Sequence, residues 1–395
     1  MSALVTNAEM LIALSVTRSL GKSGVKVTCG SDRTDSLCFH SKYCKNKTVY
    51  PSPTKEDLFI NHLEDNLKKQ KHEVLIPTFA DSLLAVSKHR EQLEEYTTIP
   101  IPAHDKIVKA LDKTETLKIA KDNGIPIPET AFIEDIKDVE KIKNEIGYPA
   151  VLKPAASFGA KGVSYIKSPE ELTTAYRINS SEHGEKMLLQ ECIPLEGEIY
   201  GFEALLNKKS ELRAGFVHKR LRHYPLTGGQ STLRESVKNP EVEKLGLKLL
   251  KALGWYGVAM VEFKIDPRDG KPKLMEINPR FWGSLHLPLV SGMNFPYLLY
   301  KMAVEGDIEP ITEYKVGVKS RALYPGDLNW LFSALRDDYA SLGLKKQSKI
   351  KVLSDFLKFY EKDLHYELFY LDDPMPGLYE IGQTIRRKTK RGVGV

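Results

Sequence analysis

Apolar runs alternate with amphipathic stretches along the first hundred residues. Short strand-like runs occupy residues 3–6, 25–29 and 74–77. Helix-like patterns occupy residues 9–20, 58–69 and 82–94. This alternation predicts a parallel, doubly wound sheet over residues 1–105. The turn after the first strand-like run has no glycine, and close approach of the backbone to a pyrophosphate requires one. We therefore interpret this unit as a scaffold that lines a substrate pocket.

A second α/β unit follows the proline- and glycine-containing break at residues 123–128. Its strand-like runs occupy residues 150–153, 163–166, 187–193, 199–206 and 211–219. Residues 154–162 are a loop of small residues, 220–235 a polar, glycine-containing loop, and 240–253 an amphipathic helix. We expect one domain over residues 106–306, with a smaller lobe at about 125–195.

The pattern of apolar and polar residues in the last part of the chain predicts a C-terminal α/β extension over residues 307–395. We expect a strand at residues 314–324 and helices at 328–336 and 351–359. The basic stretch at residues 386–391 has few apolar anchors, so we interpret it as a solvated tail.

Candidate chemistry concentrates in two strand-like runs joined by turn residues, 257–266 and 274–278. Glu276 and Asn278 share one face of the second run, because side chains alternate along a strand. If the runs pair as a hairpin, Glu262 joins them. Two carboxylates and an amide oxygen form a hard-oxygen site that suits Mg²⁺. Arg280 follows as a fixed cation where phosphoryl charge would develop. The competing interpretation is that both glutamates are merely solvated.

Composition narrows the class of protein. The chain has 395 residues, 42% hydrophobic and 28% charged, which is ordinary for a globular enzyme. Its net charge of +6 is too small to imply nucleic acid binding. No apolar run approaches the ~18 residues of a membrane span, so stable membrane insertion is not expected. Cys38 and Cys44, with His40 between them, do not complete a zinc site. Free thiols favour a cytoplasmic protein.

Glu262 followed by the Glu276-x-Asn278-x-Arg280 pattern resembles the late signature of the ATP-grasp superfamily. The glycine-containing loop at 154–162 and the hinge-like strand at 187–193 stand in the same order as in that superfamily. Residues 219–232 and 281–284 resemble a branch of carboxylate–amine ligase-like proteins, similar in domain plan to carbamoyl-phosphate synthetase. The resemblance implies an α/β (α+β ATP-grasp) fold, with a doubly wound pre-ATP-grasp domain before a two-lobed ATP-grasp module.

The resemblance also implies roles for individual residues. Phosphate contacts would come from Lys113, Lys153 and the loop residues Ser157, Gly159, Lys161 and Gly162. Adenine would bind at Gln190, Glu191, Cys192 and Ile193, and ribose at Glu198. Glu262, Glu276 and Asn278 would hold one or two Mg²⁺ ions, with Mn²⁺ as a substitute. Arg280 and Arg220 would be catalytic, facing the γ-phosphate and the acyl phosphate, and Ser231 would join them in binding substrate.

Several of these residues also have purely structural interpretations. Glu198 and the arginines Arg220, Arg222 and Arg234 fit a solvated loop as well as a ligand site, and Arg321 fits a protein surface. His218, His223 and His286 are expected to be structural, because phosphoryl transfer depends on positioning more than on a base.

The function implied is an ADP-forming ligase that uses ATP to activate a small-molecule carboxylate as an acyl phosphate and joins it to an amine. Three alternatives stay open: a thiol or hydroxyl acceptor in the same fold, a non-catalytic ATP-binding regulator, and a nucleic-acid-binding protein, which only the basic tail suggests. The expected partners are a small carboxylate and an amine, not nucleic acid, and a homodimer is left open. The acid and the amine cannot be named from the sequence, because variable pocket loops choose them.

Overall fold

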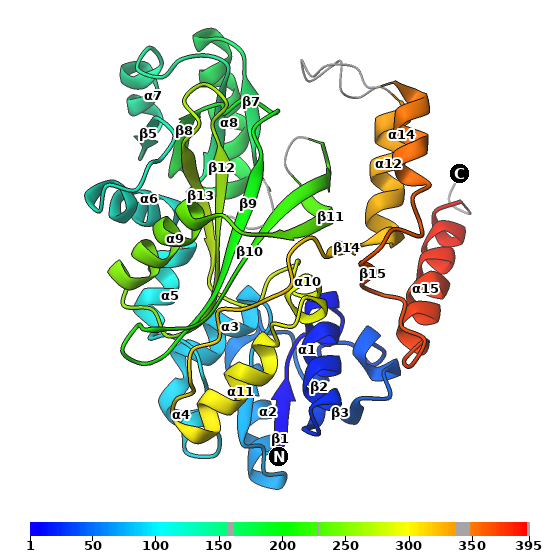
Figure 1. Ribbon diagram of the computed structural model, residues 1–395. Helices are drawn as coiled ribbons and strands as arrows, with labels where there is room; N and C mark the ends of the chain where they lie inside the picture. The colour runs from blue at the N-terminus through cyan, green and yellow to red at the C-terminus, as the bar shows by residue number, and fades with distance from the viewer. Residues whose placement is uncertain (156–161, 227–228, 337–347, 393–395) are drawn as a thin grey trace.

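The computed structural model describes residues 1–155, 162–226, 229–336 and 348–392. Three sheets follow one another along the chain (Figure 1). The predicted site residues Ser157, Gly159 and Lys161 lie outside the described residues.

The N-terminal sheet is parallel, with strand order β3-β2-β1-β4. Its strands are β1 (Ser2–Val5), β2 (Lys26–Ser31), β3 (Cys44–Val49) and β4 (Val74–Ile76). Its helices are α1 (Leu11–Lys22), α2 (Glu56–Lys69), α3 (Ala80–Lys88) and α4 (Arg90–Glu94), with a short 3-10 turn, η1 (Leu37–His40). Strands β1 and β4 are almost wholly buried, as expected for a sheet covered on both faces. The alternation of strand and helix predicted for this region is confirmed.

A small antiparallel sheet forms a separate lobe with strand order β5-β8-β6-β7. Its strands are β5 (Thr130–Ile133), β6 (Ala150–Pro154), β7 (Ser164–Ile166) and β8 (Met187–Glu191). Helices α7 (Ile136–Ile142) and α8 (Pro169–His183) pack on it around a hydrophobic core of its own. Helices α5 (His104–Leu111) and α6 (Lys113–Asp122) lead into this lobe from the N-terminal unit (Figure 1).

The central sheet has seven strands in the order β13-β12-β9-β10-β11-β14-β15. They are β9 (Ile199–Leu206), β10 (Leu212–Tyr224), β11 (Gln230–Val237), β12 (Gly257–Ile265), β13 (Pro272–Asn278), β14 (Lys319–Arg321) and β15 (Leu364–Tyr366). All neighbours are antiparallel except β14 and β15. Helix α9 (Pro240–Ala252) buries Val242, Leu249 and Leu250 against β9 and β10.

Two sequence-based expectations about this sheet are wrong. The polar loop expected at 220–235 is the end of β10 and the start of β11, which pair with each other. Buried positions alternate there with partly exposed ones, and the buried positions of β11 are polar: Thr232, Arg234 and Ser236. Polarity therefore did not indicate a loop. The strand expected at 314–324 shortens to β14, because residues before it follow the edge of the sheet, where the Tyr314 hydroxyl donates to the Val237 carbonyl at 2.7 Å.

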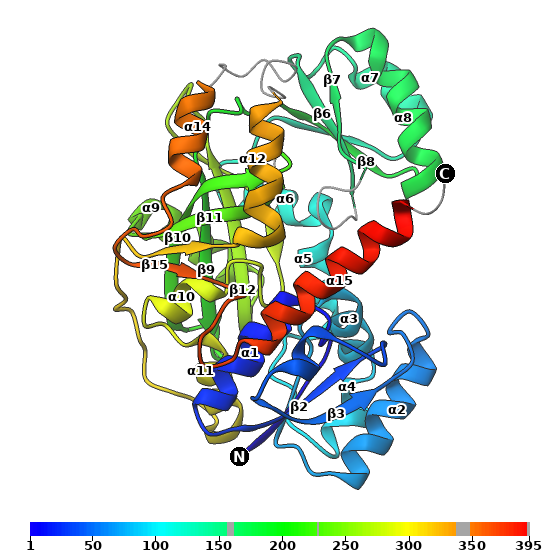
Figure 2. The same ribbon diagram turned by 90° about the vertical axis from the view of Figure 1, so that its right-hand side faces the viewer.

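The C-terminal extension returns to the N-terminal unit (Figure 2). After α10 (His286–Val290) and α11 (Phe295–Glu305) come the turn η2 (Leu323–Asp327), α12 (Leu328–Leu335), α14 (Lys349–Phe356) and α15 (Met375–Gly392). The buried Arg18 of α1 binds Asp373 at 2.8 Å, just before α15. The tail expected to be solvated continues α15 as far as residue 392. Within the described residues, no helix combines the length and apolarity that crossing a bilayer requires.

Candidate active site

An acidic centre forms where β12 and β13 pair. Their register places Glu262 directly opposite Glu276, and the Asn278 amide donates to Glu276 Oε1 at 3.1 Å. Burial raises the pKa of Glu262 to about 7; the neighbouring Glu276 charge also raises it, while Arg220 opposes the shift. Two carboxylates held together in a poorly solvated place favour a cation between them.

Two lysines bring positive charge to this centre from α6 and the small lobe. Lys153 at the end of β6 is buried, and its Nζ donates to Gln190 Oε1 at 2.7 Å. Burial, and then the charge of Lys113, lower the pKa of Lys153 to about 8, while Glu276 and Glu262 oppose the shift. Burial also lowers the pKa of Lys113, against the pull of Glu276. Like-charged ammonium groups held together form a site that an anion would stabilise.

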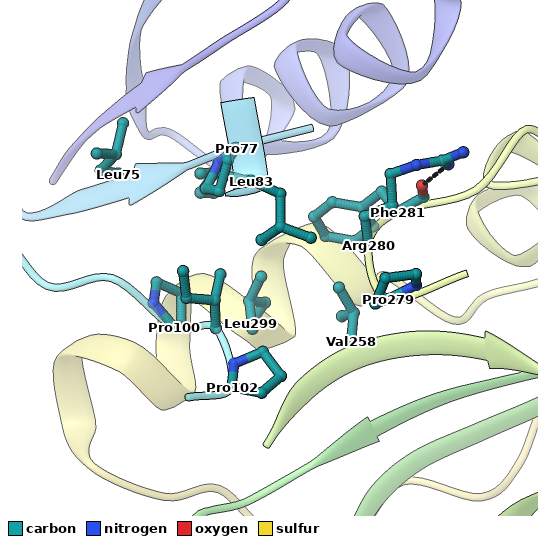
Figure 3. A pocket seen from close by; sticks show the side chains of 12 residues that line it. Leu75, Pro77, Leu83, Pro100, Pro102, Val258, Pro279, Arg280, Phe281 and Leu299 are labelled. Carbon is teal, nitrogen blue, oxygen red and sulfur yellow. Dashed lines mark hydrogen bonds between the residues drawn. The ribbon is translucent and has the colours of Figure 1, made fainter. Parts of the chain in front are cut away.

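Arg220 and Arg280 interact with different carboxylates of the acidic centre. Arg220, on β10, forms an ion pair with Glu262. Arg280 donates to the Phe281 carbonyl at 2.7 Å (Figure 3). Its guanidinium carbon also lies 5.1 Å from the centre of the Phe79 ring. Burial lowers the pKa of Arg280, while Glu276 and Asp81 oppose the shift. Phe79 and Asp81 belong to the N-terminal unit, which therefore forms one wall of the site.

A mainly apolar pocket lies at the same boundary (Figure 3). Pro77 and Leu83 of the N-terminal unit face Val258, Pro279 and Phe281 of the central sheet and the loop that follows it. This packing fixes the distance between the N-terminal wall and Arg280.

The predicted hinge joins the small lobe to the central sheet. The Glu191 carboxylate accepts from Lys273 at 2.8 Å, from Arg268 at 2.5 Å and from the Glu129 N–H at 2.9 Å. Its side chain is therefore committed to structure, and its own N–H donates to the Glu129 carbonyl at 2.8 Å. The Cys192 N–H donates to the Pro149 carbonyl at 3.2 Å.

Three other predicted residues stand apart from the acidic centre. Gly162 has a φ of +71°, and a Cβ there would lie 2.5 Å from His183 Cδ2, so glycine is required. Glu198, an exposed residue just before β9, pairs with Lys219 and accepts from the Tyr200 hydroxyl at 2.7 Å. The Ser231 hydroxyl donates within its own strand, to the Leu233 carbonyl at 3.3 Å.

Lys264 was missed by the sequence-based reasoning. It is buried, and its Nζ donates to the Ile193 carbonyl at 3.1 Å, linking the central sheet to the hinge. It lies two residues after Glu262, so the same alternation that placed Glu262 on the site face would have found it.

Three arginines for which the sequence allowed a solvated or surface position have charged or polar partners instead; Arg234 and Arg321 are buried, and Arg222 is partly buried. Arg222 donates to Asp327 at 2.9 Å and Arg321 donates to the same carboxylate at 2.6 Å. Arg234 donates to the Gly283 carbonyl at 2.8 Å. The partners of Arg222 and Arg234 come from distant parts of the chain, whereas Asp327 lies only six residues after Arg321.

Comparison with known proteins agrees with this architecture. Residues 118–292 match the family model described as the ATP-grasp domain. The biotin carboxylase of Campylobacter jejuni superposes with a TM-score of 0.68 at 18% identity, covering 80% of this chain and 74% of that one. Residues 118–292 are therefore similar to an ATP-grasp domain, and the α+β fold predicted from the sequence is confirmed.

Two curated relatives are ligases. A D-alanine–D-alanine ligase of Thermoanaerobacter sp. (strain X514) is 29% identical over 236 residues, covering 52% of this chain and 63% of that protein. A D-aspartate ligase of Enterococcus faecium is 24% identical over 299 residues, covering 70% of each. The alignment thus spans less than two thirds of the length of the first ligase.

Proposed function

We propose that the protein is an ATP-dependent, ADP-forming ligase that activates a small-molecule carboxylate as an acyl phosphate and joins it to an amine. One observation carries this proposal: Glu262 and Glu276, which face each other across β12 and β13, both interact electrostatically with Lys153, and Glu276 also interacts with Lys113. Carboxylates for a metal and lysines for phosphates, meeting between two lobes, are what the transfer of a terminal phosphoryl group requires.

The residues of the acidic centre fit Mg²⁺. Oxygen donors meet in adjacent register positions, and burial, with a smaller effect from the Glu276 charge, raises the pKa of Glu262. Glu262, Glu276 and Asn278 would hold one or two Mg²⁺ ions, which when bound neutralise the charge of the nucleotide phosphates.

The chain's own residues orient the nucleotide and balance the charge of its phosphates. Lys113, Lys153 and Gly162 bind the phosphates, together with the loop residues Ser157, Gly159 and Lys161. The backbone from Gln190 to Ile193 holds adenine, and Glu198 the ribose. Arg220 must give up its ion pair when Glu262 binds a metal, which frees its guanidinium for phosphate.

The proposed reaction has two steps. A substrate carboxylate oxygen attacks the γ-phosphorus of ATP, and ADP leaves. Arg280 and Arg220 stabilise the charge of the transferred group. The amine nitrogen then attacks the acyl carbon, phosphate leaves, and the nitrogen releases a proton to form the amide. Ser231 would contact the substrate carboxylate. Exclusion of water by the closed lobes would protect the acyl phosphate.

The relatives support a ligase without naming the substrates. A D-alanine–D-alanine ligase and a D-aspartate ligase are both named for amino acids, so amino acids are the first acids and amines to test.

The test is ADP release by the purified protein with Mg·ATP and pooled carboxylates and amines, followed by mass spectrometry of the products. We expect release only when an acid is present, and an amide mass only with acid and amine together. Glu276→Gln should abolish release, whereas Glu305→Gln, at an exposed ion pair with Lys301, should not. Tight binding of Mg·ATP without ADP release in any pool would favour a non-catalytic regulator. A thioester or ester product would show that the acceptor is a thiol or a hydroxyl group instead of an amine.

A further inference from the structure

The C-terminal extension contributes two strands and two buried carboxylates to the substrate side of the central sheet. Strands β14 and β15 continue the sheet beyond β11 (Figure 1). Both lie outside the residues that match the ATP-grasp domain, which end at 292. The chain then runs past Asp373 to α15, which lies beside the N-terminal unit (Figure 2).

The loop after Arg280 is held by two buried ionisable residues, a guanidinium and a carboxyl group. Arg234 of β11 is 2% exposed, and its Nη1 donates to the Gly283 carbonyl at 2.8 Å. Glu203 of β9 is fully buried and accepts from the Ser284 hydroxyl at 2.6 Å. Consecutive residues of the loop are thus fixed to two strands of the sheet, within four residues of Arg280.

Arg234 is in turn held by the C-terminal extension. The carboxylate of Glu367, immediately after β15, forms an ion pair with Arg234. Glu367 also accepts from the Ser320 hydroxyl of β14 at 3.3 Å. A buried guanidinium that loses its counter-charge must move toward water or toward another anion, because an unpaired charge in a protein interior is costly. Movement of Arg234 would release Gly283.

A second carboxylate of the extension acts on the neighbouring strands. Asp327 is fully buried and accepts from Arg222 of β10 at 2.9 Å and from the Thr232 hydroxyl of β11 at 3.0 Å. The strands that carry Arg220 and Ser231 are therefore fastened to the same extension.

We propose that Glu367 is a positioning residue of the active site: through Arg234 it fixes the loop 281–284 and with it the guanidinium of Arg280. Its effect on turnover rests on the proposed ligase function, but its effect on the loop does not. The C-terminal extension then positions active-site residues, in addition to stabilising the fold.

Trp282 provides a direct measurement of the loop. It is 1% exposed and lies between Phe281 and Gly283, so its accessibility reports whether the loop is clamped. We would measure acrylamide quenching of Trp282 fluorescence with Trp255 and Trp330 replaced by phenylalanine. Glu367→Gln keeps the shape of the side chain but removes its charge. We expect at least a twofold increase in the quenching constant.

The matched control is Glu361→Gln in the same extension, since Glu361 pairs at the surface with Lys319. It should leave quenching unchanged. Mg·ADP affinity, measured by calorimetry, should stay within twofold of wild type in both variants, because the nucleotide residues lie elsewhere. If the ligase proposal holds, Glu367→Gln should also lower kcat at least tenfold, with KM for ATP unchanged.

Arg234→Lys is a second variant in case Glu367→Gln fails to fold. Its single ammonium retains the charge opposite Glu367 but lacks the planar fork that also reaches the Gly283 carbonyl. It should expose Trp282 in the same way. Wild-type quenching in these variants, or an equal increase in Glu361→Gln, would overturn the proposal. Absence of ADP release from wild-type protein would remove the ligase proposal and leave the quenching test intact.

Discussion

Replacing Lys153 with methionine should stabilise the protein while it weakens nucleotide binding. Burial lowers the pKa of Lys153 from 10.5 to about 8. Below pH 8 the folded chain therefore carries a buried positive charge that destabilises it. That difference corresponds to about 3 kcal/mol, at 1.36 kcal/mol for each pH unit. Loss of the hydrogen bond to Gln190 cancels about 1–2 kcal/mol of this stabilisation. We expect a net gain of about 1–2 kcal/mol at pH 7, since methionine fills a similar volume.

Urea unfolding followed by circular dichroism at pH 7 and pH 9.5 measures this effect. In the unfolded chain the lysine keeps its proton up to a pKa of about 10.4. The wild type therefore gains stability as the pH rises from about 8 to about 10.4, and the Lys153→Met variant does not. The advantage of the variant should be largest below pH 8 and disappear by pH 9.5.

Lys186→Met is the matched control, because Lys186 lies in the same lobe but its side chain is 73% exposed. It should change the unfolding free energy by less than about 0.5 kcal/mol at either pH. Mg·ATP binding should weaken at least tenfold in Lys153→Met alone. Loss of stability at pH 7, or a gain that does not depend on pH, would refute the reasoning about a strained buried charge.

Three further predictions concern Gly201, Asp327 and Glu262. Gly201→Ala should cost about 1–3 kcal/mol in urea unfolding, because its Cβ would lie 2.2 Å from His218 Cε1; the cost should shrink in a His218→Ala background. Asp327→Asn should cost about 3–5 kcal/mol by leaving buried arginines unpaired, whereas Asp355→Asn, in a surface ion pair, should cost less than about 1 kcal/mol. The pKa of Glu262 is about 7, so Mg²⁺-dependent ADP binding should weaken by up to about tenfold per pH unit below 7, and Glu262→Gln should remove that dependence.

The elements that define the fold class could be predicted because their signals are local. The strands that carry Glu262 and Glu276 begin and end close to the expected residues, since side-chain alternation and the turn residues between them act over a few positions. The same local reasoning failed at Arg222 and Arg234. Their polarity suggested a loop, but their counter-charges arrive from the C-terminal extension and complete a buried strand pair.

The sequence alone determined which residues can share a face of a strand, and so which side chains could act together in a metal site. The tertiary structure alone decided which strands become neighbours. It brought Asp327 to Arg222, 105 residues away, and Glu367 to Arg234, and it committed Glu191 to an ion-pair cluster. Alternation is a property of the local backbone, whereas the partner of a buried charge depends on the path of the whole chain.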